Sequence, residues 1–382
     1  TSPSIYVKIP MVDSADDIIP EVRGKAVSIV IWTTTPWTIP SNLAIALHPQ
    51  FTYAAVDVGG DNVYILARDL VDACMATFGI ENYTIVAEFA ASLLEKKQCR
   101  HPLYERDSMI ILGNHVTLDA GTGCVHTAPG HGREDYEVGR AYGIEAYSPV
   151  DDNGNFMDDV EYFRGGFVFD TNDAITAKLD AAGALLARQK LEHSYPHCWR
   201  CKQPVIFRAT PQWFISMDKT GLRDESLKAI DNVKWIPHWG RDRIYGMIDN
   251  RPDWCISRQR AWGVPIAVFY CSECETLHLD QEIIDHVFAL FEAHGADVWF
   301  ERSVDELLPK GAQCRNCGSA SFVKETDILD VWFDSGVSHA AVLEDRDYLK
   351  WPADLYLEGS DQHRGWFHSS LLTAVGLRNR AP

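Results

Sequence analysis

The sequence has 382 residues, of which 46% are hydrophobic and 23% charged, a composition typical of a folded protein with two or three domains. No apolar run reaches the length of a membrane span, so we expect no membrane partner. The formal net charge of −19 argues against binding to nucleic acid, but local clusters of arginine and lysine leave that partner class open. Because the chain starts at Thr1 without a methionine and ends just after an expected helix, we expect it to be part of a longer protein.

A polar stretch, Trp32–Asn42 (Trp-Thr-Thr-Thr-Pro-Trp-Thr-Ile-Pro-Ser-Asn), follows an apolar run at Ala26–Ile31 that predicts a buried strand. Pro36 and Pro40 cannot donate backbone hydrogen bonds to a neighbouring strand, so we expect the strand to end near Thr35. The loop then presents adjacent threonine hydroxyls, which suit a polar ligand such as a ribose or a carboxylate. The alternative is an edge whose hydroxyls are satisfied within the protein.

The part of the chain up to residue 190 is predicted to be an α+β domain. Further strand-like runs lie near residues 51–58, 62–67, 83–88 and 109–118, and helical patterns near 68–78, 133–142 and 173–188. The turn Gly59-Gly60-Asp61-Asn62 predicts a hairpin. Many strands with few crossover helices indicate a mixed, β-barrel-like sheet instead of a doubly wound one.

The second part of the chain is divided by its cysteines. Residues 191–263 are expected to form a connection and part of an α/β core, with a helix near 220–231, and residues 264–326 a cysteine-bounded insert with a helix near 282–294. Residues 327–382 return to strand-loop-helix order, with a strand expected at Asp354–Leu357 and a helix from about Arg364. This order is typical of an α/β Rossmann-type sheet with ligand residues at the carboxyl end of a strand.

A second chemically distinctive stretch is Gly121–Tyr136 (Gly-Thr-Gly-Cys-Val-His-Thr-Ala-Pro-Gly-His-Gly-Arg-Glu-Asp-Tyr). It lacks the endings of a P-loop or a dinucleotide fingerprint, a His-Glu-x-x-His metal motif and a serine nucleophile elbow. What remains is a pair of imidazoles, His126 and His131, and the carboxylate of Asp135. Asp135 falls in the first turn of the expected helix, where it either favours the helix dipole or binds a cationic ligand.

Six of the ten cysteines form three Cys-x-x-Cys pairs, which indicates metal binding instead of disulfides. Two pairs bracket the insert and predict a structural four-cysteine zinc site, with reduced thiols as the alternative: Cys271, Cys274, Cys314 and Cys317. The third pair, Cys198 and Cys201, has no second pair beside it in the sequence and is expected to be a partial zinc site. Single buried thiols are expected at four positions: Cys74, Cys99, Cys124 and Cys255.

Together, Trp32–Asn42 and Gly121–Tyr136 resemble the editing site of isoleucyl-tRNA synthetases, and the resemblance extends over nearly the whole chain. It implies that residues 1–190 are an editing domain, which hydrolyses valyl-tRNA(Ile) with a positioned water and no protein nucleophile. Relatives specific for leucine and valine typically carry Thr-Thr-Arg-Pro-Glu-Thr where this chain has Thr-Thr-Thr-Pro-Trp-Thr, which favours isoleucine. Two alternatives stay open: a noncatalytic tRNA- or zinc-binding module, and an editing domain of the valyl or leucyl type. The resemblance also implies a monomer, a cytoplasmic location, and tRNA(Ile), isoleucine and valine as partners.

The resemblance assigns roles to individual residues of this domain. Asp135 matches the aspartate that holds the α-ammonium of the misattached amino acid, and His126 matches the histidine of the side-chain pocket. Four positions match residues that contact the terminal adenosine and the ester: Thr33, Thr34, Thr35 and Asn42. Trp32 and His131 are expected to flank the pocket.

Three later blocks resemble the catalytic core of the same enzymes: Trp254–Arg260, Asp330–Gly336 and Glu358–Phe367. The resemblance implies an isoleucine-pocket wall at Trp366 and contacts of the aminoacyl-adenylate with four residues: Glu358, Gly359, Asp361 and Gln362. The family's His-Ile-Gly-His-like and Lys-Met-Ser-Lys-Ser signatures, which position ATP, do not occur in the 382 residues. We therefore expect ATP and Mg²⁺ to be used only by the full-length enzyme, and isoleucyl-adenylate not to form on this chain.

Overall fold

The computed structural model describes residues 2–16 and 18–382. The chain divides into two compact units, unit 1 ending at Thr210 and unit 2 running from Pro211 to Pro382. Residues beyond the boundary expected at 190 stay with unit 1, because Ile206 packs against its core and the Ala209 N–H donates to Gly130 O at 2.7 Å. Among the described residues, no helix combines the length and the apolar character that crossing a membrane requires.

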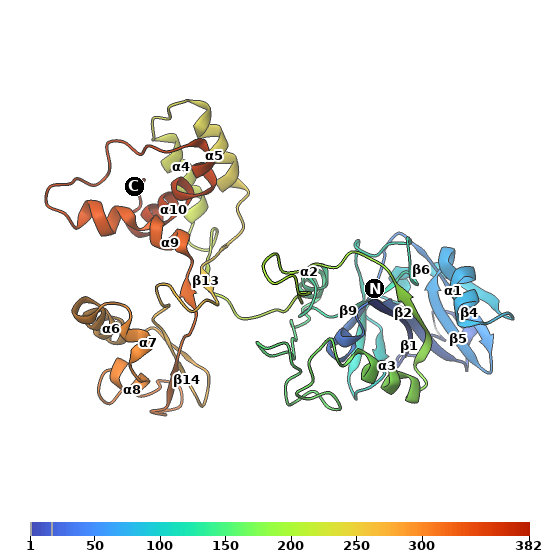
Figure 1. Cartoon of the computed structure of the whole chain (residues 1–382). Coiled ribbons are helices and arrows are strands. Elements are labelled where there is room, and N and C mark those ends of the chain that lie inside the picture. Colours follow the sequence, from blue (N-terminus) through green and yellow to red (C-terminus); the bar gives the residue numbers. More distant parts are fainter. Residues whose placement is uncertain (1, 17) are drawn as a thin grey trace. The chain divides into compact units, whose positions relative to one another are not determined.

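Unit 1 is built mainly from strands (Figure 1). Its strands are β1 (Ser2–Pro10), β2 (Ala26–Thr33), β3 (Ala44–Leu47), β4 (Thr52–Gly59), β5 (Asn62–Ala67), β6 (Thr84–Ala90), β7 (Gln98–Arg100), β8 (Asp107–Leu112), β9 (Cys124–Thr127) and β10 (Leu185–Leu191). Its α-helices are α1 (Val71–Phe78), α2 (Arg133–Ala141) and α3 (Asn172–Ala181). Short 3-10 turns are η1 (Pro20–Val22), η2 (Pro36–Ser41), η3 (Arg68–Leu70) and η4 (Ala91–Leu93).

The strands of unit 1 form one mixed sheet that closes on itself. The ladder runs β1–β2–β9–β3–β8–β7, and an isolated bridge between Met11 and Cys99 joins the chain just after β1 to β7. β5, β4 and β6 extend from β2 as a side sheet, and β10 pairs with β1. The barrel-like mixed sheet predicted from the sequence is confirmed, and so is the hairpin between β4 and β5.

Alternating side chains along β2 separate two hydrophobic cores. Ile29 and Ile31 are buried in the core of the barrel, whereas Val30 and the half-buried Trp32 face a second core that includes residues of α1. This alternation follows from strand geometry, because successive side chains point to opposite faces of a sheet. It also decides which residues of the next stretch can reach a common site, since Thr33 continues the face of Ile31.

Two elements of unit 1 differ from the sequence prediction. The predicted helix over 173–188 is wrong in its second half: α3 ends at Ala181, and Gly183 has φ 66°, a left-handed conformation that ends helices. Leu185–Leu191 instead forms β10, which pairs with β1. This strand was not predicted from the sequence. A strand partner so remote in the chain leaves no local signal. The strand predicted over 109–118 ends earlier, at Leu112.

Unit 2 has short strands and more helix than unit 1 (Figure 1). Its strands are β11 (Phe214–Ile215), β12 (Trp254–Cys255), β13 (Ser257–Arg258), β14 (Phe269–Cys271), β15 (Leu277–His278), β16 (Phe322–Lys324) and β17 (Ile328–Leu329). Its α-helices are α4 (Leu222–Asp231), α5 (Trp239–Asp249), α6 (Gln281–His294), α7 (Val298–Glu301), α8 (Val304–Leu307), α9 (Val331–Gly336) and α10 (Trp366–Arg378). A π-helix, η5 (His339–Glu344), and a 3-10 turn, η6 (Ser360–Arg364), complete it.

Two hydrophobic cores hold unit 2. The first is formed where α4, α5 and α10 pack together, around Ile244 and Leu372. The second lies in the cysteine-bounded insert, where the fully buried Trp299 packs against Phe269 of β14 with ring centroids 5.0 Å apart. Figure 1 shows α6, α7 and α8 gathered beside β14. The insert therefore has a small core of its own beside its cysteines.

Only part of the expected Rossmann-type strand-loop-helix pattern is present in unit 2. The helix predicted from about Arg364 is present as α10, but the strand expected at Asp354–Leu357 does not form. The strands described in unit 2 pair as short antiparallel ladders, β11–β12, β13–β17 and β15–β14–β16. A parallel strand needs a hydrogen-bonded neighbour, and no described residue pairs with Asp354–Leu357.

Candidate functional site

A cavity of about 330 Å³ lies in unit 1 where β2 ends and η2 begins. It is lined by both polar stretches and by the segment after β10: Thr33, Thr35, Trp37, Thr38, His126, Ala128, His131, Asp135, His193, Ser194, Tyr195, Pro196 and Phe207. The ladder explains the meeting, because β9 lies between β2 and β3. Two stretches far apart in the chain thus line one cavity.

Two of the three adjacent threonines reach the cavity. Thr33 and Thr35 line it, whereas Thr34 is not among the lining residues. Trp32, expected to flank the pocket, turns to the opposite face of β2, where its Nε1 donates to Ser4 Oγ at 2.6 Å. Thr33 Oγ1 accepts from the Thr35 N–H at 3.0 Å, which leaves the hydroxyl proton of Thr33 for a ligand.

The η2 turn is held in place from outside the cavity. The Trp37 N–H donates to Asn172 Oδ1 of α3 at 3.1 Å. His101 Nδ1 accepts from the backbone N–H of Leu103 at 3.0 Å, so the ring proton is on Nε2 and is donated to Ile39 O at 2.9 Å. Burial lowers the pKa of His101 to about 3, which keeps this ring neutral. Polar contacts with other segments of unit 1 therefore fix the loop that carries the threonines.

His126 is buried, with 6% of its surface exposed, and lines the cavity. It is on β9, opposite Ile45 of β3. Its Nε2 lies 2.9 Å from Thr38 Oγ1, and its Nδ1 lies 2.8 Å from Asn42 Nδ2. Burial, with a smaller contribution from the nearby His131, lowers the pKa of His126 to about 3. The neutral ring forms part of the cavity wall, and both of its nitrogen atoms are already hydrogen-bonded to protein groups.

Asn42 lies behind His126 instead of at the cavity wall. It is 1% exposed and is not among the lining residues. Its Nδ2 donates to Ala44 O at 2.9 Å as well as to His126, and its Oδ1 accepts from Ser108 Oγ at 2.7 Å. Because a backbone carbonyl can only accept, the atom that faces Ala44 O and His126 must be the amide nitrogen. The direct contact with an ester that the resemblance implied for Asn42 is not available in this arrangement.

Asp135 presents a carboxylate to the cavity from the first turn of α2, as predicted. Its Oδ2 accepts from the Ala128 N–H at 2.8 Å. None of the ion pairs formed by the described residues includes Asp135. Burial raises the pKa of Asp135 above its ordinary value, because the desolvated anion is costly. A cation bound in the cavity would reduce that cost.

Trp37 and His131 form a wall of the cavity with unused polar atoms. Their rings meet edge to face, with centroids 5.0 Å apart and an interplanar angle of 79°. His131 Nδ1 donates to Phe207 O at 3.0 Å, so its Nε2 is an acceptor. Neither His131 Nε2 nor Trp37 Nε1 has a hydrogen-bond partner among the described residues. The wall is thus mainly apolar, with one free acceptor and one free donor.

One side of the cavity was not predicted from the sequence; it is formed by residues 193–196 and by Phe207. Tyr195 is half-buried there, next to Pro196. These residues follow β10, so their position depends on the pairing of β10 with β1. The only local signal was an aromatic next to a proline just before the Cys198 pair. Trp37 and Thr38 belong to the stretch Trp32–Asn42, but the sequence does not show that their side chains point into the cavity.

The residues assigned to an aminoacyl-adenylate lie in unit 2, around η6 and the start of α10. Four of them lie within one five-residue stretch, and the first three of these are exposed: Glu358, Gly359, Asp361 and Gln362. Gln362 Oε1 accepts from the Trp366 N–H at 2.9 Å. The Trp366 ring stacks on Tyr356 with centroids 4.5 Å apart. The structure thus places all five near one helix start, with Trp366 packed against its own unit.

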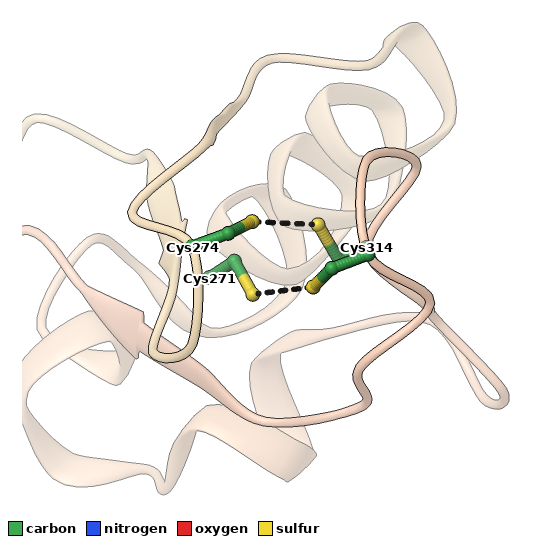
Figure 2. A group of neighbouring side chains, drawn as sticks. Cys271, Cys274 and Cys314 are labelled. Atoms are coloured by element: carbon green, nitrogen blue, oxygen red, sulfur yellow. Dashed lines mark hydrogen bonds between the residues drawn. The ribbon is translucent and has the colours of Figure 1, made fainter.

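The insert brings four thiols together (Figure 2). They are Cys271, Cys274, Cys314 and Cys317, whose sulfur atoms all lie within 4.8 Å of one another. Two sulfur pairs, Cys271–Cys317 and Cys274–Cys314, are each 3.5 Å apart. A tetrahedral ion with metal–sulfur bonds of about 2.3 Å needs sulfur atoms about 3.8 Å apart. The four cysteines therefore fit a metal ion, and among the described residues no second group of this kind occurs.

All three Cys-x-x-Cys pairs share the same turn. In each, the N–H of the first cysteine donates to the carbonyl five residues later, and the N–H four residues later donates back to the cysteine carbonyl, with that fourth residue at positive φ. The donor–acceptor distances for these two bonds are 2.8 and 2.9 Å at Cys198, 3.0 and 2.9 Å at Cys271, and 2.7 and 2.8 Å at Cys314. The positive φ values are 61° at Lys202, 56° at Glu275 and 75° at Gly318. Cys198 and Cys201 thus form a turn of the same shape as the two turns that meet in the insert.

Comparison with known proteins gives consistent relatives. The family model described as "tRNA synthetases class I (I, L, M and V)" matches residues 23–382. Curated proteins named isoleucine--tRNA ligase from Syntrophotalea carbinolica and Geobacter sulfurreducens are 58% identical over 381 residues and 59% identical over 382. Each alignment covers 100% of this chain and 41% of the relative, so the chain spans about two fifths of the length of these proteins.

Solved structures with partial similarity match about half of the chain. One, described as the crystal structure of GlLeuRS-CP1, is 17% identical, covers 50% of this chain and 100% of that chain, and has a TM-score of 0.41. Another, the cytosolic leucyl-tRNA synthetase editing domain of P. knowlesi, is 13% identical, covers 49% of this chain and 96% of that chain, and has a TM-score of 0.39.

Proposed function

The chain belongs to the class I tRNA synthetases (I, L, M and V), and from this premise we propose that unit 1 is an editing domain that hydrolyses valyl-tRNA(Ile). The observation that carries the proposal is the cavity into which Asp135 presents a largely buried carboxylate. This carboxylate forms no ion pair with any described residue, and threonine hydroxyls and uncharged rings line the cavity beside it. The identity of 58–59% to isoleucine--tRNA ligases supports isoleucine as the amino acid of the parent enzyme. The Thr-Thr-Thr-Pro-Trp-Thr run supports the same choice.

Asp135 is the group that binds the α-ammonium of the misattached amino acid. An ammonium is the natural partner of a carboxylate that forms no ion pair with any described residue, and a charge-assisted bond is about twice as strong as a neutral one. Burial raises the pKa of Asp135, but an ammonium at hydrogen-bond distance opposes that shift. Recognition of the ammonium therefore also keeps Asp135 ionised in the complex.

The hydrolysis uses a positioned water, because the cavity offers no activated protein nucleophile. His126 cannot serve as a strong base, since burial lowers its pKa to about 3 and both its nitrogens are hydrogen-bonded. Thr33 retains a hydroxyl proton for a ligand oxygen, and the neighbouring Thr35 lines the same wall. Holding the ester and the water among fixed dipoles lowers the barrier without a covalent intermediate.

The cavity acts as a second sieve. For one methylene in an apolar pocket, with isoleucine against valine as the standard example, discrimination is worth only about 1–3 kcal/mol. A first pocket that selects for isoleucine therefore admits valine, and a second pocket must accept valine while excluding the larger side chain. His126, Trp37 and His131 are the rigid rings able to set that limit. We assign the side-chain pocket to this wall.

We infer that the four-cysteine site of the insert holds zinc. Four thiolates in a closed tetrahedral set are typical of structural zinc, with no open position for catalysis. Zinc would link the Cys271 and Cys314 turns beside the small core around Trp299. Cys198 and Cys201 form a half-site that needs two further ligands.

Other properties belong to the longer protein of which we infer this chain to be a part. We propose that the whole enzyme charges tRNA(Ile) with isoleucine using ATP and Mg²⁺, and that η6 and its neighbours contact the adenylate there. All ten cysteines are free thiols, which suits a reducing, cytoplasmic location. We expect a monomer.

Deacylation of valyl-tRNA(Ile) and isoleucyl-tRNA(Ile) by the full 382-residue chain tests the proposal. We expect release of valine only, slowed about tenfold to a hundredfold in Asp135→Ala, because a hydrogen bond to a charged group is lost. Asp158→Ala, which removes an exposed carboxylate of the same unit, is the matched control. Release of neither amino acid, with tRNA(Ile) still bound in a titration, would indicate a noncatalytic binding module instead.

A further inference from the structure

A continuous hydrogen-bond chain runs behind the cavity wall at His126. It starts at Ser108 of β8, whose hydroxyl donates to Asn42 Oδ1 at 2.7 Å. Asn42 Nδ2 donates to His126 Nδ1 at 2.8 Å, and Thr38 Oγ1 lies 2.9 Å from His126 Nε2. The Thr38 hydroxyl donates to Thr35 O at 2.8 Å. Every member of the chain except Thr35 is buried.

The topology explains why these residues meet. β3 is parallel to β8 on one side and antiparallel to β9 on the other. Asn42 lies just before β3, so its side chain reaches Ser108 at the start of β8 and His126 of β9. Thr38 comes from η2, the turn that leads into the same strand. The contacts therefore follow from the strand order of the barrel.

Each donor in the chain is determined by elimination. Asn42 Nδ2 faces the carbonyl of Ala44, so it is the amide nitrogen and can only donate to His126 Nδ1. Nδ1 therefore carries no proton, and a neutral ring must carry its proton on Nε2. The Thr38 hydroxyl proton is used on Thr35 O, so Thr38 Oγ1 is free to accept from His126 Nε2. Only one tautomer of His126 satisfies every group.

We infer that Asn42 is a positioning residue that acts through His126, holding its ring in the Nε2–H tautomer and in one orientation, with Ser108 orienting the Asn42 amide. Thr38, which itself lines the cavity, accepts from Nε2–H and completes the tie. This inference rests on the proposed function, in which His126 limits the size of the amino-acid side chain that fits. A ring tied at both nitrogens cannot rotate to admit a larger side chain. Asn42 then serves specificity without touching the substrate.

Two substitutions separate the roles of the two partners. Asn42→Asp is nearly isosteric but presents an acceptor to Nδ1, so His126 must place a proton on Nδ1. Thr38→Val keeps the shape and removes the acceptor of Nε2–H, so the tautomer stays and the ring loses one tie. Ser92→Ala, at an exposed hydroxyl of unit 1, is the control.

The first readout is ¹⁵N NMR of the full chain labelled at histidine, with His126→Gln to assign the signals. We expect a protonated Nε2 and a non-protonated Nδ1 in the parent chain, in Ser92→Ala and in Thr38→Val. In Asn42→Asp we expect a protonated Nδ1. Should Asn42→Asp fail to fold, the parent spectrum decides: a protonated Nδ1 there would overturn the inference.

The second readout is the ratio of valyl- to isoleucyl-tRNA(Ile) deacylation rates. We expect Asn42→Ala, which removes the tie at Nδ1 and leaves every cavity-lining side chain in place, to lower this ratio about tenfold, the scale of discrimination for one methylene, by raising isoleucine release. A fall in both rates with an unchanged ratio would overturn the specificity role. If the parent chain released neither amino acid, the proposed function would fail, while the NMR spectra would still decide the tautomer and its partners.

Discussion

Acid should destabilise unit 1 through His126. The neutral ring is buried and tied by Asn42 and Thr38, and burial lowers its pKa from the ordinary 6.5 to about 3. The unfolded chain therefore binds a proton at this residue at a pH where the folded chain does not. The contribution of His126 is fully present above about pH 6.5 and is lost as the pH falls toward 3.

The size of the effect follows from these two pKa values. At about pH 5, protonation lowers the free energy of the unfolded state by RT ln(1 + 10^1.5), or about 2 kcal/mol, and leaves the folded state nearly unchanged. At about pH 7 the same term is only about 0.2 kcal/mol. We thus expect His126 alone to account for a loss of about 2 kcal/mol between the two conditions.

Urea titrations at the two pH values, read by hydrogen-exchange mass spectrometry of peptides from unit 1, measure this loss. His126→Gln should lower stability at both values but show a pH-dependent loss smaller by about 2 kcal/mol than that of the parent. Ser92→Ala, at an exposed hydroxyl of unit 1, is the control and should keep the loss of the parent chain. An equal pH-dependent loss in the parent and His126→Gln would refute the reasoning, since His126 would then be protonated in the folded chain.

Two further outcomes test packing and the metal site. Gly130→Ala should destabilise unit 1 by about 1–3 kcal/mol in the same titration, because the new Cβ would lie 2.1 Å from the backbone oxygen of Tyr147. Gly246→Ala, in open space on α5, should stabilise unit 2 slightly, and a loss there as large as at Gly130 would contradict the steric argument. Metal analysis should find about one zinc ion per chain, and its removal by a chelator should speed hydrogen exchange in Phe269–Lys324 without affecting the barrel of unit 1. Protection in that segment that survives chelation would mean that the core around Trp299 suffices alone.

Local patterns predicted the elements whose signal is local. The apolar run before Thr33, the hairpin at residues 59–62 and the helix that carries Asp135 all formed as predicted. The cysteine spacing also predicted the group of four thiols in the insert. The strand, the hairpin and the helix depend on residues that are close in the sequence. The four thiols are far apart in the sequence, but paired Cys-x-x-Cys spacings rarely occur by chance.

Elements that depend on remote partners were not readable. β10 forms by pairing with β1, from which it is separated in sequence by nearly the whole of unit 1, and the pairing places Tyr195 and Pro196 at the cavity. Conversely, Asp354–Leu357 has the composition of a strand but forms no strand ladder with any described residue. A strand is stable only as part of a ladder, so its own sequence cannot decide its fate.

The sequence by itself determined which chemical groups are available to the site: threonine hydroxyls at a strand end, an imidazole and a carboxylate in one glycine-rich stretch. The tertiary structure decided which of them face the cavity. Strand alternation turns Trp32 away, and the strand order puts Asn42 behind His126 instead of beside a ligand. Residue type sets what a side chain can bind, whereas its direction is set by neighbours that only the closed sheet brings together.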